Sequence, residues 1–153
     1  MKIVLLWVGK TKNQDLLSLL EQYERRIGHF CELLLKEVKA ADEVETDRAM
    51  AREGKQLLAK IQPDDYVVVL DPQGETLTSE ELGAVIADKK DHSIKNLVFV
   101  VGGHWGLSAS VKVRANKLLS LSKMTLSHEM TRLILVEQIY RAFARIHHIP
   151  YHK

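Results

Sequence analysis

The last nine residues of the chain, RIHHIPYHK, bring together side chains that can transfer protons near neutral pH. Histidine titrates close to physiological pH, and His147, His148 and His152 lie beside Tyr151 in this stretch. By composition alone the stretch fits a frayed chain end, a metal site or part of an active site. No metal is predicted, because no cysteine or paired acid lies near and the spacing matches no standard zinc pattern.

Three glycines follow an apolar run in the stretch FVVGGHWGLSAS. Gly102, Gly103 and Gly106 allow a sharp backbone turn and the close approach of a ligand, and the next helix start offers N–H groups to an anion. The spacing is neither G-x-G-x-x-G nor a P-loop. It fits a nucleotide-like cofactor rather than a triphosphate with magnesium. A tight strand-to-helix turn without a ligand is the alternative.

An acid and a base stand four residues apart in the final helical stretch. Glu137 and Arg141 have the acid on the N-terminal side, which is the favourable order for an i,i+4 pair. A solvated pair on a helix surface is the ordinary interpretation, and an arginine oriented for chemistry is the other. The apolar stripe of this helix is wide, which indicates an oligomer.

Apolar runs alternate with helical periodicity along the whole chain. Strands are predicted at residues 2–8, 31–38, 66–71 and 96–103, and helices at residues 14–27, 43–61, after Thr78, after Ser108 and from Ser127 to about His147. A turn is predicted at residues 72–75 (PQGE). Alternation of this kind is typical of an α/β fold with a mostly parallel sheet flanked by helices.

Ligands of parallel sheets bind at the carboxyl ends of the strands. This rule selects the loop after Leu70 and Asp71, the loop after Val101 and the segment that leads into the last helix. The three places are therefore the predicted site.

Composition predicts one domain over residues 1–153 and a cytoplasmic protein. The chain has 46% hydrophobic residues and a single cysteine, and it has no apolar run near the ~20 residues that cross a bilayer. Its charge is asymmetric: residues 112–153 hold 8 of the 22 Lys/Arg but only 2 of the 20 Asp/Glu. A basic end of this kind indicates an anionic partner such as RNA, or a helix-rich end without a partner.

Three stretches in this order resemble the SPOUT methyltransferase family: LVFVVGGHWGLS, LSLSKMTLSHEMTRLILVEQIYRAF and the terminal PYHK. The bulky pair His104-Trp105 departs from the small or acidic residues of the family. The resemblance implies a trefoil knot over roughly residues 97–145, the cofactor S-adenosyl-L-methionine and a homodimer with a composite site. It also implies methylation of N3 of a pseudouridine in the helix 69 loop of 23S rRNA, on assembled ribosomes.

The resemblance implies specific cofactor contacts, which fall in the three loops selected above. They are Leu70, Gly102, Leu121, Ser122, Lys123, Met124, Thr125 and Leu126.

Chemical roles follow from the reaction that the resemblance implies. An arginine suits the negative charge that grows on the base, which nominates Arg141 braced by Glu137. A histidine suits removal of the imide proton, which nominates His152 before His128, and Tyr151 is expected to stack on or orient the base. Predicted contacts with RNA phosphates are Arg114, Lys117, Arg132 and Lys153.

Three other functions remain open on the sequence. They are a SPOUT methyltransferase of another RNA such as tRNA, a non-catalytic ribosome-binding factor and a Rossmann-like dinucleotide binder. The last lacks an acid at the expected spacing after the glycine loop.

Overall fold

A five-stranded sheet forms the centre of the computed structural model, which describes residues 1–42 and 45–151. The strands are β1 Lys2–Val8, β2 Leu33–Val38, β3 Tyr66–Thr76, β4 Asn96–Val101 and β5 Lys117–Ser120, in the order β2-β1-β4-β3-β5. Every pairing among these strands is parallel. The predicted α/β fold with a mostly parallel sheet flanked by helices is confirmed.

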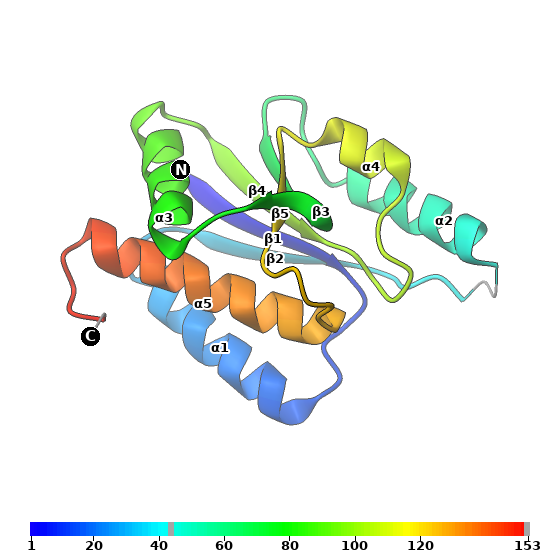
Figure 1. Cartoon of the computed structure of the whole chain (residues 1–153), viewed down its shortest axis with the longest axis horizontal. Coiled ribbons are helices and arrows are strands. Elements are labelled where there is room, and N and C mark those ends of the chain that lie inside the picture. The colour runs from blue at the N-terminus through cyan, green and yellow to red at the C-terminus, as the bar shows by residue number, and fades with distance from the viewer. Residues whose placement is uncertain (43–44, 152–153) are drawn as a thin grey trace.

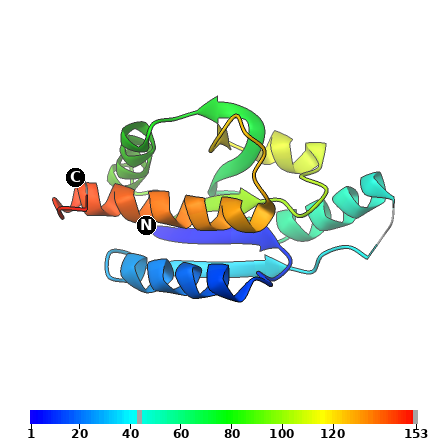
Figure 2. The same ribbon diagram turned by 60° about the horizontal axis from the view of Figure 1, so that its bottom comes forward.

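Helices cover both faces of the sheet (Figures 1 and 2). They are α1 Gln14–Gly28, α2 Thr46–Leu58, α3 Ser79–Asp91, α4 Ala109–Arg114 and α5 His128–Ile146. One layer holds α1, α3 and α5, and the other holds α2 and α4. The start of the predicted helix at residues 43–44 lies outside the described residues.

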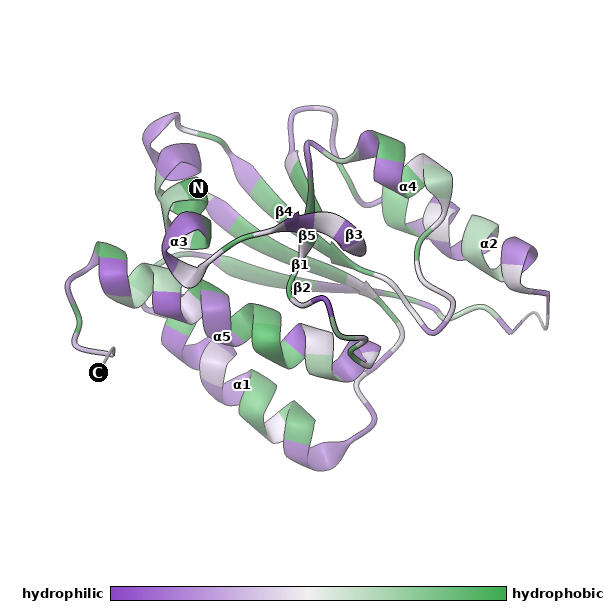
Figure 3. Ribbon diagram, in the orientation of Figure 1, coloured by the Kyte–Doolittle hydropathy of each residue, from purple (hydrophilic) through white to green (hydrophobic). Residues whose placement is uncertain are grey.

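Alternate residues of the central strands enter two separate cores. In β1, Ile3, Leu5 and Trp7 pack under α1, α3 and α5, whereas Val4 and Leu6 pack under α2 and α4. Because both faces are covered, the strands are apolar throughout rather than alternating. Figure 3 shows the resulting hydrophobic colour along the central strands.

Helix starts follow the capping signals in the sequence. Thr78 Oγ1 accepts a hydrogen bond from Glu81 N–H, while the Glu81 carboxylate accepts one from Thr78 N–H, which completes a capping box. Ser127 caps α5 through a hydrogen bond from Met130 N–H. Caps of this type stabilise a helix by about 1 kcal/mol each.

The predicted turn at residues 72–75 is wrong. β3 continues to Thr76, and its register against β5 shifts so that Leu70 and Glu75 both stand opposite Leu119. The fifth strand, which the sequence did not indicate as a strand, supplies the pairing partner that keeps this segment extended. Pro72 and Gly74 are accommodated because the ladder is irregular at that point.

The trefoil knot over residues 97–145 and the single domain over residues 1–153 stay predictions. In the described part of the chain, no helix has the length and apolar character to span a membrane.

Candidate cofactor and active site

A cavity of about 850 Å³ opens at the carboxyl ends of β4 and β5 and beside residues 70–73 of β3. Its walls are this part of β3, the loop from β4 to α4, the segment from β5 to α5 and the first turn of α5. Apolar side chains line much of it: Met50, Leu70, Val101, Leu107, Leu119, Leu121, Met124 and Leu126. These are the three places that the strand-end rule selected from the sequence, and the volume is that of a small-molecule site.

The glycine loop forms one wall of the cavity. A Cβ atom on Gly102 would lie 2.9 Å from backbone atoms of Gly106 and from Cγ of Leu107, so the loop closes on itself only with glycine here. The rings of His104 and Trp105 meet edge to face at 4.6 Å. Trp105 is 40% exposed at the rim of the cavity.

The segment from β5 to α5 forms the opposite wall through a compact turn. Ser120 Oγ donates to the Ser122 carbonyl at 2.9 Å, and Met124 N–H donates to Ser122 Oγ at 2.9 Å. Of the eight predicted cofactor contacts, seven line the cavity and Lys123 does not. Whether these residues contact a cofactor stays a prediction.

An ion pair between a buried acid and a half-exposed lysine stands in the cavity wall, and sequence reasoning did not single it out as a pair. Lys112 Nζ lies 2.6 Å from Oδ2 of Asp71, which is 7% exposed, and Gln73 N–H donates to Asp71 Oδ1 at 2.8 Å. Burial by itself raises the pKa of the Asp71 carboxyl, but the hydrogen bonds from Lys112 and Gln73 outweigh it and hold the pKa below its usual value. The position of Asp71 directly after a buried strand was the available signal.

The first turn of α5 places His128 and Thr131 at the cavity. Burial, and then the charge of Arg132, lower the pKa of His128, so the imidazole is neutral at neutral pH. Next to it, the Glu129 carboxylate accepts hydrogen bonds from Lys12 N–H at 2.7 Å and Asn13 N–H at 3.3 Å. The turn is thereby fixed to the connection between β1 and α1.

The prediction that Arg132 contacts RNA is wrong, because its side chain is fully buried. Its guanidinium donates to Thr11 Oγ1 at 2.9 Å and to the Val8 carbonyl at 2.5 Å, and it lies 4.9 Å from the centre of the Trp7 ring. Arg132 therefore fixes α5 to the end of β1. By helical periodicity Arg132 lies opposite the apolar stripe of α5, but the segment after β1 covers that side of the helix.

Two other predicted RNA contacts, Arg114 and Lys117, are also engaged within the chain. Arg114 donates to the carbonyls of Gln62, Pro63 and Asp65, and Lys117 forms an ion pair with Glu75. Lys153 and the predicted base His152 lie outside the described residues.

A second group of predicted residues gathers on α5 and the chain end. Arg141 Nη2 lies 2.5 Å from Glu137 Oε1, and the Tyr151 hydroxyl donates to the same oxygen at 3.2 Å. The Arg141 guanidinium lies 4.9 Å from the centre of the Tyr151 ring. The hydrogen bond and charge of Glu137 raise the pKa of Arg141. We call Glu137, Arg141 and Tyr151 the α5 cluster.

The α5 cluster extends to α1 through an aromatic contact. The hydroxyls of Tyr151 and Tyr23 lie 3.1 Å apart, and the ring of Tyr140 meets that of Tyr151 edge to face at 4.7 Å. Burial, then the hydrogen bond with Tyr23 and the nearby Glu137, raise the pKa of Tyr151. The hydroxyl is therefore a neutral phenol that can donate a hydrogen bond.

Within one chain the cavity and the α5 cluster lie apart. His128 at the cavity and Arg141 in the cluster are on the same helix, which rises ~1.5 Å per residue and so separates them by about 20 Å. The structure brings together the predicted cofactor residues in one place and Glu137, Arg141 and Tyr151 in another. It does not join the two groups in a single chain.

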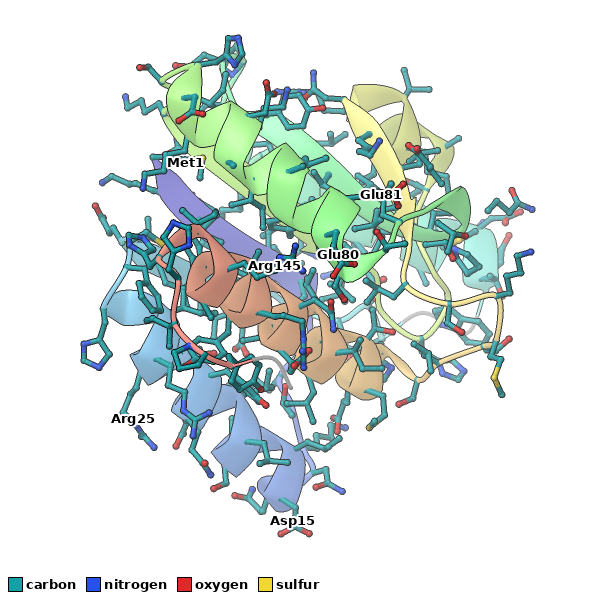
Figure 4. The ribbon with its side chains drawn as sticks, turned by 60° about the vertical axis from the view of Figure 1, so that its left-hand side comes forward. Met1, Asp15, Arg25, Glu80, Glu81 and Arg145 are labelled. Atoms are coloured by element: carbon teal, nitrogen blue, oxygen red, sulfur yellow. The ribbon has the colours of Figure 1, made fainter. Side chains whose placement is uncertain are left out.

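The rest of the histidine-rich end lies on the surface. His147 and His148 are exposed, and the ring of His147 stacks on Phe30 at 5.0 Å. Near this end of α5, Arg145 points toward Glu80 of α3 (Figure 4) and pairs with it at 2.5 Å. Among the residues that the structure describes, no group of three His, Cys, Asp or Glu could hold a metal ion.

The lining of the cavity fits S-adenosyl-L-methionine. Apolar side chains from the strand ends suit an adenine ring, the backbone of the glycine loop offers polar groups at close range, and the Asp71–Lys112 pair suits a zwitterionic amino acid moiety. A parallel α/β sheet with such a cavity beside its strand ends is typical of proteins that bind a nucleotide-like cofactor.

Comparison with known proteins identifies the family. The model of the family described as "Predicted SPOUT methyltransferase" matches residues 1–152, and the chain belongs to the SPOUT methyltransferase family. It is similar over its full length to proteins named ribosomal RNA large subunit methyltransferase H. Identity is 38% with the protein of Geotalea daltonii over 99% of both chains. It is 39% with that of Streptococcus sanguinis and 40% with that of Bifidobacterium adolescentis, over 100% of all chains.

Proposed function

We propose that this protein methylates N3 of a pseudouridine in the helix 69 loop of 23S rRNA, with S-adenosyl-L-methionine as the methyl donor. The observation that carries the proposal is the full-length similarity to proteins named ribosomal RNA large subunit methyltransferase H. The cavity at the strand ends supports it, because its lining suits the donor. The site of action would be cytoplasmic, where ribosomes are found.

The cavity would hold the donor between the glycine loop and the segment of residues 121–126. When bound, the donor supplies an electrophilic methyl group on a sulfonium, and transfer is an in-line displacement. Alignment of the two reactants can contribute roughly 7–11 kcal/mol to such a step. The role of Leu70, Gly102 and the 121–126 segment is therefore to hold the donor in one orientation and to exclude water.

The acceptor nitrogen carries an imide proton, and negative charge develops on the flanking oxygens as this proton leaves. Arg141 would stabilise that charge, because Glu137 fixes its guanidinium by two contacts to one oxygen. Tyr151, a neutral phenol, would donate a hydrogen bond to the base or stack on it. We assign the proton transfer to His152 before His128, because the neutral ring of His128 faces the cofactor cavity.

The reaction needs a second copy of the chain. Because His128 at the cavity and Arg141 in the α5 cluster are about 20 Å apart along one helix, we infer that one subunit alone does not present both to the same substrate atom. A homodimer in which the cavity of one protomer faces the α5 cluster of its partner would complete the site. α5 and α1, which carry the cluster and its tyrosine contacts, would contribute to the interface.

Assembled ribosomes are the expected substrate. Phosphate neutralisation dominates affinity for RNA, and the described basic residues Arg114, Lys117 and Arg132 are engaged within the chain. A preformed ribosomal surface would supply the remaining contacts. Transfer of labelled methyl groups to whole ribosomes and to naked 23S rRNA fragments measures this difference directly, and equal methylation of both would overturn the substrate assignment.

Mixing two inactive variants tests the reaction and the composite site together. Gly102→Val should block the cavity, and Arg141→Gln should disable the α5 cluster, so each variant alone should fail to methylate ribosomes. Mixed subunits should regain activity, because one of the two sites in a heterodimer is then intact. Absence of recovery would exclude a shared site.

Two further measurements separate the alternatives. Truncation after Ile149 removes Tyr151, and methylation should be lost while the fold and cofactor binding survive. Calorimetry with S-adenosyl-L-methionine separates an enzyme from a ribosome-binding factor, since a factor without catalysis has no need to bind the donor.

A further inference from the structure

A buried carboxylate lies beneath the glycine loop of the cofactor cavity. Glu53 of α2 is 3% exposed, and its Oε1 accepts a hydrogen bond from Ala41 N–H at 2.9 Å. Its Oε2 has no hydrogen-bond partner within the described part of the chain. A buried charged oxygen without a partner is costly, so this oxygen marks a place where a donor is needed.

The glycine loop rests directly on this turn of α2. A Cβ atom on Gly103 would lie 3.2 Å from Glu53 Oε2, and one on Gly54 would lie 2.2 Å from Ser108 Oγ at the far end of the loop. Met50, one turn earlier in α2, lines the cavity. We call Glu53 and Gly54 the loop seat.

The loop carries unused donors next to the seat. Gly106 N–H donates to the Gly103 carbonyl at 3.2 Å, which closes the turn. His104 and Trp105 lie between these two glycines. Their backbone N–H groups donate no hydrogen bond to any residue that the structure describes. The acceptor without a donor, Glu53 Oε2, therefore lies close to Gly103, the residue directly before these two N–H groups.

We propose that Glu53 is a positioning residue for the cofactor site: its free Oε2 accepts a hydrogen bond from a backbone N–H of residues 104–105 when the cofactor fills the cavity. Without the cofactor, the same carboxylate lies against Gly103 of the loop without a hydrogen bond to it. Glu53 does not line the cavity, so it acts through the loop and not on the cofactor. This inference rests on the proposed function for the identity of the cofactor.

Glu53→Gln is the sharpest test, because it keeps the size of the side chain. In this variant the amide oxygen must accept the hydrogen bond from Ala41 N–H. The amide NH₂ group then faces the loop, and it cannot accept a hydrogen bond from a backbone N–H of the loop. The KM for S-adenosyl-L-methionine should rise about tenfold, as expected for one lost hydrogen bond to a charged group, with kcat little changed. Hydrogen exchange of residues 102–107 should slow with cofactor in the parent protein but not in the variant.

Asp65→Asn is the matched control. Asp65 is also a buried carboxylate, but both of its oxygens are satisfied, by Asn96 Nδ2 and Gln62 N–H, each at 2.8 Å. This variant should lower the unfolding midpoint without altering KM or exchange in the loop. If Glu53→Gln behaves in the same way, with KM and loop protection unchanged, Glu53 is merely structural and the proposal is wrong.

Acrylamide quenching of tryptophan fluorescence tests the seat without a cofactor. Trp7 is 1% exposed, so quenching reports mainly on Trp105 in the loop, and Glu53→Gln should increase it. If the parent protein binds no S-adenosyl-L-methionine, the proposed function fails while quenching still reports on the seat. Equal quenching of the parent and Glu53→Gln would overturn the seat itself.

Discussion

The hydroxyl of Tyr151 lies 3.2 Å from Oε1 of Glu137, so the chain end is held against the middle of α5. The same oxygen binds the Arg141 guanidinium. One carboxylate thus orients both a cation and a phenol, and its loss should affect both at once.

Glu137→Gln should lower the rate of methyl transfer to ribosomes by about 10²-fold or more, as expected when a positioned charge-stabilising group is lost. Affinity for S-adenosyl-L-methionine should not change, because Glu137 does not line the cavity. Single-turnover methylation and calorimetry measure the two effects. Glu80→Gln is the control. Glu80 of α3 pairs at the surface with Arg145, which lies on α5 as Glu137 does, and an exposed pair of this kind contributes at most about 1 kcal/mol to stability. Equal rates for the two variants would refute the role of Glu137.

Arg132→Met should reduce stability rather than RNA affinity. The change leaves the Val8 carbonyl and the Thr11 hydroxyl without their buried donor, at a cost of about 1–3 kcal/mol for each unsatisfied group. Thermal unfolding should show a lower midpoint, while the salt dependence of ribosome binding stays as in the parent. A reduced salt dependence with an unchanged midpoint would restore Arg132 as a phosphate contact.

Affinity for S-adenosyl-L-methionine should decline in mild acid. Burial, and then Arg132, lower the pKa of His128 below the ordinary 6.5, so the ring gains its proton only below about pH 6.5. An imidazolium there would repel the cationic sulfonium. The free energy of unfolding should also decrease in mild acid. The unfolded state takes up this proton at a higher pH than the folded state, so the contribution of His128 to stability is present above about pH 6.5 and is lost as the pH falls.

Calorimetry across this pH range checks the prediction for His128. His128→Asn should flatten the profile, whereas His92→Asn, at the exposed end of α3, should not. S-adenosylhomocysteine, which lacks the sulfonium charge, should show a weaker dependence on pH. An identical pH profile for both ligands would exclude charge repulsion by His128.

Lys112→Met should weaken cofactor binding. It leaves the buried Asp71 carboxylate in the cavity wall without its cation, and an unpaired buried group of this kind costs about 1–3 kcal/mol. Lys117→Met is the control, because Lys117 pairs with the exposed Glu75 and does not line the cavity. If Lys117→Met lowered the affinity for the cofactor more than Lys112→Met does, the lysine that matters for cofactor binding would be Lys117 of β5.

Local signals in the sequence were sufficient for most elements and for the place of the cavity. The helix starts at Thr78 and Ser127 and the apolar strands depend on near neighbours, so the local residue pattern predicted them. The strand-end rule located the cavity because parallel strands end at one edge.

Features that depend on distant residues were not accessible from the pattern. β5 has four residues and is a strand only through its pairing with β3, and the extension of β3 depends on β5 in turn. The burial of Arg132 depends on a segment more than a hundred residues earlier in the chain. The loop seat at Glu53 is likewise a tertiary contact that no local spacing indicates.

The contacts between the first turn of α5 and the connection after β1 also bear on how the chain folds. Glu129 bonds to Lys12 and Asn13 across 117 and 116 residues, and α5 supplies Leu135, Val136 and Phe143 to the core over β1. Contacts of such sequence separation form slowly. α5 follows β1 by more than a hundred residues, so it can cover its part of β1 only after all the intervening elements have been synthesised. Until then this part of β1 is an exposed apolar surface that favours aggregation of the nascent chain.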